Sequence, residues 1–96
     1  MKEIDMMQKL SDFYKIFSDT TRLRIIEYLF DGKKCVNEIS DNLKVSQSAI
    51  SHQLKSLRQS DLVKTEKIGK LVYYELKDDH IKKIFESGLE HIKERL

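Results

Sequence analysis

Residues 36–60, which read VNEISDNLKVSQSAISHQLKSLRQS, decide the fold of this chain. Apolar residues three and four positions apart predict a short helix over Val36–Leu43. Ser46 is a typical N-cap residue, and it predicts a second helix that runs from Gln47 to about Ser60. Residues 42–45 form the turn between them. Two helices joined by a turn of a few residues, the second of them well capped, are typical of a helix-turn-helix.

The second helix of this motif has two different sides. Its inner side is apolar and continues just past the helix end, with Ala49, Ile50, Leu54, Leu57 and Leu62. Its N-cap and outer side are polar and free of acids, with Ser46, Gln47, Ser48, Ser51, His52, Lys55 and Arg58. Short polar side chains near a helix N-terminus can reach base edges, while Lys and Arg can hold phosphates. A generic solvated face is the alternative, but such a face normally carries Glu and Asp as well. The pattern favours binding to double-stranded DNA.

A β-hairpin is predicted directly after the helix-turn-helix. Residues 62–68 and 71–76 are rich in β-branched and aromatic residues, and a turn that contains Gly69 separates them. Between positions 44 and 70 the chain has six Lys or Arg against two acids, a balance of +4, whereas the whole chain carries +2. This local charge predicts that the hairpin lysines, Lys64, Lys67 and Lys70, also contact DNA.

Amphipathic helices are predicted on both sides of these elements. The first spans about residues 3–17, the second spans Thr21–Phe30, and the last occupies the C-terminal end. Arg22 and Arg24 are assigned to a solvated edge, from which either could reach a phosphate. The order of elements, α-α-α-α-β-β-α, defines one winged helix-turn-helix domain over residues 1–96, mainly α with a β-hairpin. Because so short a chain buries a limited core, we expect its first and last helices to form a homodimer.

The totals exclude several classes of protein. The chain has 96 residues and a single cysteine, Cys35, which rules out an intrachain disulfide framework and suits a reducing compartment. No apolar run approaches the roughly 18 residues of a membrane span, and the N-terminus does not resemble a signal peptide. The sequence therefore predicts a cytoplasmic protein that does not enter a membrane.

The terminal helix, from Asp78 to Glu94, holds two of the three histidines. His80 and His91 are eleven residues apart, so they share a face but lie about 16 Å apart along the axis. One metal ion cannot reach both from a single helix. In an antiparallel pair of helices, His80 and Asp78 of one chain would instead lie beside His91 and Glu94 of the other. The spacing favours two metal sites per dimer, and a solvated polar helix face is the alternative.

Three segments resemble the signature segments of the ArsR/SmtB family of metal-sensing repressors. They are DTTRLRII at 19–26, VSQSAISHQL at 45–54 and GKLVYY at 69–74. The resemblance covers nearly the whole chain and implies a dimeric winged-helix repressor that releases operator DNA when metal binds. It also implies that Asp78, His80, His91 and Glu94 are the ligands of the terminal-helix zinc motif of the SmtB-like branch.

The sequence departs from the family pattern in two places. Thr20 stands where the family commonly has proline, which should alter only the start of the helix. The family's other metal site uses a Cys-x-x-Asp or Cys-x-Cys motif with N-terminal Cys or His ligands. Here Cys35 and Glu38 remain, but residues 1–34 contain no Cys or His. We expect this second site to be lost and Cys35 to be a small buried apolar residue. The sequence does not decide whether Cys35 and Glu38 form a residual metal site.

These observations favour a metal-responsive transcriptional repressor. Two imidazoles and two carboxylates suit Zn(II), with Co(II) as a substitute. The alternatives are a winged-helix repressor that answers a non-metal signal and a metal-binding dimer that does not bind DNA. An enzyme is not expected, because four protein ligands would close the metal site and no nucleophile–base pair or Gly-rich phosphate loop is apparent.

Overall fold

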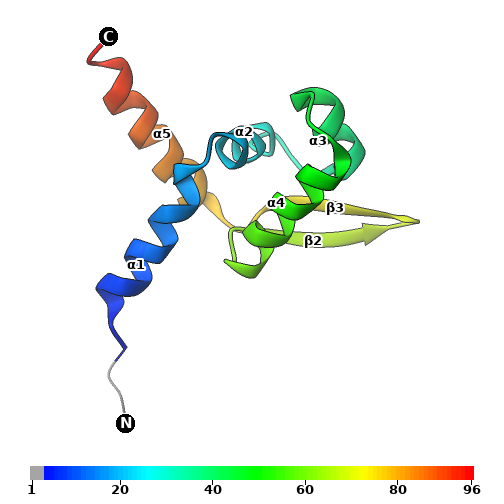
Figure 1. Cartoon of the computed structure of the whole chain (residues 1–96), viewed down its shortest axis with the longest axis horizontal. Coiled ribbons are helices and arrows are strands. Elements are labelled where there is room, and N and C mark those ends of the chain that lie inside the picture. Colours follow the sequence, from blue (N-terminus) through cyan, green and yellow to red (C-terminus); the bar gives the residue numbers. More distant parts are fainter. Residues whose placement is uncertain (1–3) are drawn as a thin grey trace.

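The computed structural model describes residues 4–96, and its helix-turn-helix lies beside the β-hairpin (Figure 1). The helices are α1 (Met6–Lys15), α2 (Thr20–Tyr28), α3 (Val36–Leu43), α4 (Gln47–Gln59) and α5 (Asp79–Lys93), with a 3-10 turn, η1 (Ile16–Ser18), after α1. The strands are β1 (Lys34–Cys35), β2 (Val63–Ile68) and β3 (Leu71–Leu76). The structure thus confirms a winged helix-turn-helix, mainly α with a β-hairpin.

The helix boundaries follow their capping residues. Helix α1 starts after Asp5, whose carboxylate accepts a hydrogen bond from the backbone N–H of Gln8. The predicted start at residue 3 lies outside the described residues. Helix α2 starts one residue earlier than predicted, because Asp19 is its N-cap and accepts the N–H of Arg22. It ends at Tyr28 rather than Phe30.

One core joins α2, α3, α4, the wing and the start of α5. Its fully or almost fully buried members are Ile25, Ile26, Leu29, Ile39, Ile50, Leu54, Leu57, Leu62, Val63 and Ile81. The predicted inner side of α4 is confirmed, except that Ala49 is only half-buried. Burying this side turns the opposite side of α4 outward, because side chains on one helix repeat every 3.6 residues.

The sheet contains a third strand that the sequence pattern did not predict. Strand β1 pairs antiparallel with β3, with Lys34 opposite Tyr74 and Cys35 opposite Tyr73, so the strand order is β1-β3-β2. A strand of two residues is too short to show an alternating pattern. Its pairing attaches the wing to the start of α3. Cys35 is buried, as predicted.

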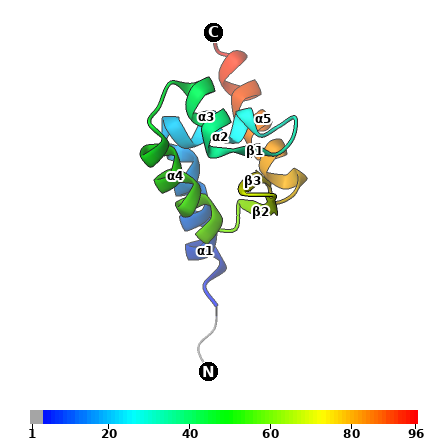
Figure 2. The same cartoon turned by 90° about the vertical axis from the view of Figure 1, so that its right-hand side faces the viewer.

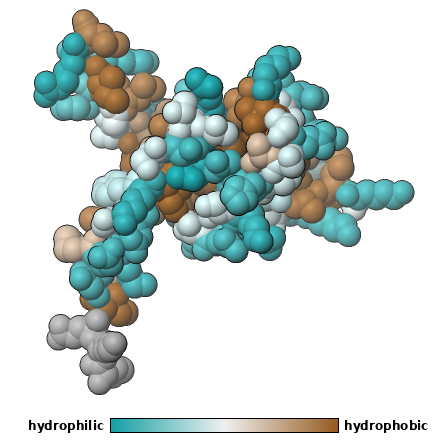
Figure 3. All heavy atoms as spheres, viewed as in Figure 1, coloured by the Kyte–Doolittle hydropathy of each residue, from teal (hydrophilic) through white to brown (hydrophobic). Residues whose placement is uncertain are grey.

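Helices α1 and α5 project from the body on the side away from the wing, and the two termini lie at opposite ends (Figures 1 and 2). Large apolar side chains are exposed on or beside both helices, namely Ile4, Met6, Met7, Leu10, Tyr14, Leu89, Ile92 and Leu96. Apolar surface is visible on both projecting helices in Figure 3. A groove of about 860 Å³ separates α1 and α2 from α5, and its lining includes Phe17, Phe85 and His91. These faces lack a partner within the described chain.

Candidate nucleic-acid interface and metal centre

Local hydrogen bonds fix the start of α4. Lys44 adopts a left-handed conformation (φ 59°) at the end of α3, which turns the chain sharply. The hydroxyl of Ser40 donates to the carbonyl of Val45, and the Val45 N–H returns a bond to the Ser40 carbonyl. Ser46 then caps α4 by accepting the Ala49 N–H at 3.2 Å. The hydroxyl of Ser46, one of the predicted DNA contacts, is therefore already used as a cap.

The remaining predicted residues of α4 lie together on its outer side. All are exposed: Gln47, Ser48, Ser51, His52, Lys55 and Arg58. No acid belongs to α4, whose sequence is QSAISHQLKSLRQ. This side therefore presents short polar groups near the helix N-terminus and two cations farther along.

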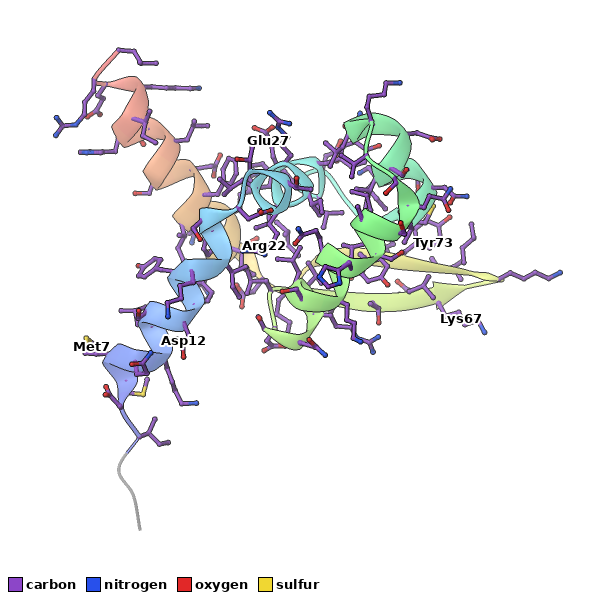
Figure 4. The ribbon with its side chains drawn as sticks, viewed as in Figure 1. Met7, Asp12, Arg22, Glu27, Lys67 and Tyr73 are labelled. Atoms are coloured by element: carbon purple, nitrogen blue, oxygen red, sulfur yellow. The ribbon has the colours of Figure 1, made fainter. Side chains whose placement is uncertain are left out.

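The wing lysines differ in their surroundings. The ammonium of Lys64 lies 3.9 Å from the Glu75 carboxylate, so part of its charge is compensated across the hairpin. Lys67 and Lys70 are exposed and form no ion pair within residues 4–96. Figure 4 shows Lys67 on the outer part of the wing. Glu66, the nearest acid in sequence, is paired with Lys33 instead. The free positive charge of the wing is therefore concentrated toward its tip.

The assignment of Arg22 to a solvated edge was wrong. Its side chain is half-buried and donates hydrogen bonds to backbone carbonyls at the end of α1 and to Gln53 of α4. The sequence shows that Arg22 lies three residues after Asp19, which indicates a capped helix start. No pattern in the sequence predicts that Arg22 contacts Gln53, which lies 31 positions away. Arg24 is exposed, as predicted.

At the start of α5, an imidazole and a carboxylate lie side by side. Asp78 is the N-cap, and its Oδ1 accepts the backbone N–H of His80 at 2.9 Å. The same oxygen lies 3.1 Å from Nδ1 of His80. Both side chains are largely open, with 50% of Asp78 and 83% of His80 exposed. The cap therefore brings one nitrogen and one oxygen donor together without burying either of them.

The second pair lies at the other end of α5. His91 and Glu94 are exposed, and Glu94 is the C-cap residue. Nε2 of His91 accepts a hydrogen bond from Nε of Arg95 at 3.2 Å. Within residues 4–96, no three His, Cys, Asp or Glu side chains converge on one point. One chain therefore holds Asp78 and His80 in contact at one end of α5, with His91 and Glu94 three residues apart at the other.

The fold and this polar, locally basic face define a winged helix-turn-helix regulator of the DNA-binding class. Comparison with known proteins makes the assignment more specific. Residues 19–65 match the family model described as bacterial regulatory protein, arsR family. The chain belongs to the ArsR/SmtB family of metal-sensing transcriptional regulators. Members of this family are transcriptional regulators and not enzymes.

Individual relatives agree over most of the chain. A transcriptional repressor SmtB homolog from Synechocystis is 36% identical over 91 residues, which are 95% of this chain and 69% of the relative. A cadmium resistance regulatory protein CadC homolog from Staphylococcus aureus is 37% identical over 82 residues, or 84% and 68%. The structure of HlyU from Vibrio cholerae superposes with a TM-score of 0.79 at 33% identity, covering 88% of this chain and 91% of HlyU.

None of the helices within residues 4–96 combines the length and the apolar character that crossing a membrane requires.

Proposed function

We propose that this protein is a zinc-responsive transcriptional repressor, which binds operator DNA as a homodimer and releases it when metal binds between the C-terminal helices. The observation that carries the proposal is the pair of donor sets at the two ends of α5. Asp78 and His80 lie in contact at one end, His91 and Glu94 are three residues apart at the other, and all four side chains are accessible. Each set alone supplies half of a tetrahedral zinc site.

The exposed faces of α1 and α5 support a homodimer. Eight large apolar side chains lie exposed on or beside these two helices, and an apolar groove lies between the helices. A two-fold dimer covers the same patch on both copies, which removes this surface from water. An antiparallel arrangement of the two α5 helices would place Asp78 and His80 near the partner's His91 and Glu94.

The donor set fits zinc better than cadmium. Zn(II) accepts tetrahedral nitrogen and oxygen ligands, whereas soft thiolates favour softer metals. The relative from Staphylococcus aureus is named for cadmium resistance, but this chain has one cysteine, and Cys35 is buried at the start of α3. Bound zinc would supply a link between the two α5 helices, with His80 and His91 unprotonated.

On the DNA side, we assign roles by side-chain type and position. Gln47, Ser48, Ser51 and His52 lie near the N-terminus of α4 and are assigned to base edges, with Ser46 beside them as the cap. Lys55 and Arg58 on α4, and Lys64, Lys67 and Lys70 on the wing, are assigned to phosphates. Dimerisation then places two recognition helices about one helical turn of DNA apart.

Metal and DNA would act on one another through the dimer geometry. The donor pairs lie on α5, and Phe85 of α5 packs edge-to-face on Phe30 with ring centres 5.0 Å apart. Ile81 of α5 also lies in the core that carries α4. A changed angle between the two α5 helices therefore changes the separation of the recognition helices. Linkage requires DNA to weaken zinc binding by the same factor that zinc weakens DNA binding, typically about 5–150-fold.

The decisive experiment is operator affinity with and without stoichiometric Zn(II), measured by fluorescence anisotropy at fixed salt, because salt alone changes the affinity strongly. We expect zinc to weaken binding of the wild-type protein. Asp78→Ser should abolish this response while leaving metal-free affinity intact, since serine still caps α5. Glu90→Ala, an exposed acid of the same helix, is the matched control and should respond normally.

Three outcomes would contradict the proposal. An affinity that zinc leaves unchanged would indicate a repressor that answers a non-metal signal. Tighter DNA binding with zinc would indicate a co-repressed regulator. A response to Cd(II) that exceeds the zinc response and disappears in Cys35→Ser would move the metal site to α3.

A further inference from the structure

Arg22 connects two parts of the molecule that are distant in sequence. Its Nε donates to the Ile16 carbonyl at 2.9 Å, and Nη2 lies 3.5 Å from the Lys15 carbonyl. Its Nη1 donates to Oε1 of Gln53 at 3.3 Å. Figure 4 shows Arg22 between the end of α1 and helix α4. One guanidinium therefore bonds to the end of the first helix and to the recognition helix at once.

The carbonyl end of this connection is chemically suited to a cation. The last carbonyls of a helix have no partner within the helix and carry partial negative charge. Lys15 ends α1 and Ile16 begins η1, so their carbonyls lie at such an end, where the Ser18 hydroxyl also donates to the Lys15 carbonyl. An arginine can donate hydrogen bonds to both carbonyls and to a third acceptor at the same time, because its N–H groups point in fixed directions from a planar guanidinium. A lysine ammonium lacks this fixed geometry.

The other end of the connection is Gln53, which does not belong to the outer, polar side of α4. Gln53 is half-buried, whereas the neighbouring His52 is exposed. Gln53 is therefore not among the residues assigned to DNA. Apolar contacts hold α4 in the core without strong directionality, but a hydrogen bond depends steeply on distance and angle. The Arg22–Gln53 bond is suited to fixing how α4 is rotated relative to α1.

We propose that Arg22 and Gln53 are positioning residues that fix the recognition helix relative to the dimer-forming helix α1 and thereby set the half-site spacing the dimer accepts. This inference rests on the proposed DNA-binding homodimer, but not on its metal. Because α1 belongs to the dimer face, the angle between α1 and α4 determines the separation of the two recognition helices. One inserted base pair moves a half-site by about 3.4 Å and rotates it by about 34°.

The test compares DNA duplexes that differ only in spacing. A two-fold duplex is first selected from random-sequence DNA by the wild-type protein. Variants of this duplex then have one base pair inserted or removed between the half-sites. We expect wild-type protein to bind the parent duplex at least about tenfold more tightly than either spacing variant. Gln53→Ala should reduce this ratio to about threefold or less, because the bond that orients α4 is lost.

Two further variants sharpen the test. Gln59→Ala changes an exposed glutamine of the same helix that has no side-chain hydrogen bond within residues 4–96, and it should keep the wild-type ratio. Arg22→Lys keeps the charge but loses the planar guanidinium, so it should resemble Gln53→Ala. The double variant Arg22→Lys/Gln53→Ala should lose no more selectivity than Arg22→Lys alone, because Arg22→Lys already removes the bond to Gln53. Thermal unfolding checks that each variant is folded.

The readout separates positioning from stability, because it is a ratio of two affinities of one protein. A Gln53→Ala ratio equal to that of wild type would overturn the inference, and so would equal losses in Gln53→Ala and Gln59→Ala. Failure of the wild-type protein to select any two-fold duplex is a different result. It would overturn the proposed DNA-binding homodimer, and the positioning role with it.

Discussion

Mixing two inactive histidine variants should restore zinc binding, if the ligands come from both chains. His80 and His91 lie on one exposed face at opposite ends of α5, about 16 Å apart along the helix axis. Each proposed site then takes His80 from one chain and His91 from the other. His80→Ala alone and His91→Ala alone should each damage both sites of a homodimer.

The expected size of the rescue follows from this arrangement. In a heterodimer of the two variants, one site loses both histidines and the other keeps both. Free exchange between equal amounts of the variants produces heterodimers as about half of all dimers. Each heterodimer has one intact site of two, so zinc content should rise from near zero to about one quarter of the wild-type value. Purified heterodimers should reach about one half.

The assay is zinc content after equilibration with a chelator that removes weakly held metal. His52→Ala is the matched control, because His52 is the remaining histidine of the sequence and lies on α4. It should retain full zinc content. If purified heterodimers bind no more zinc than the parent variants, the ligands come from a single chain and the two-chain site is wrong.

Three further predictions test the core, the DNA face and a helix cap. Leu54→Ala should lower the free energy of unfolding by about 2.7–5 kcal/mol in urea at fixed protein concentration, because Leu54 is completely buried; a loss below about 1 kcal/mol would contradict its core role. Lys70→Ala should weaken binding to specific and random DNA equally and lower the salt slope by about one, whereas Gln47→Ala should change base preference; equal effects of both variants would refute this division. The Cys35 backbone N–H donates to Glu38 and lowers the pKa of Glu38 below its ordinary value of 4.5. The stability that this hydrogen bond contributes is present above that value and is lost as pH falls through the lower folded pKa. Between pH 7 and pH 3, Glu38→Gln should therefore lose less stability in thermal unfolding than the wild-type protein does. A pH profile equal to that of the wild type would contradict this role of Glu38.

The helices and the wing could be predicted because their signals are local. Ser46 and Asp78 are capping residues, and the structure uses both as caps. The apolar spacing on α4 predicted which side is buried, and the same spacing left the polar side outward. The break of the first helix into a 3-10 turn at Ile16–Ser18 was not predicted. The apolar pattern alone does not distinguish it from a continuous helix.

The sequence by itself determined the order of elements, the acid-free outer side of α4 and the two donor pairs on α5, because periodicity and capping act over a few neighbouring residues. Only the tertiary structure decided the partners of Arg22, the pairing of β1 with β3 and the partial neutralisation of Lys64 by Glu75. Lys64 and Glu75 face each other because of the β2-β3 register, whereas packing of the core brings Arg22 to Gln53 and β1 to β3. The distance between Arg22 and Gln53 depends on the angles between the helices that carry them, and no local sequence pattern predicts it.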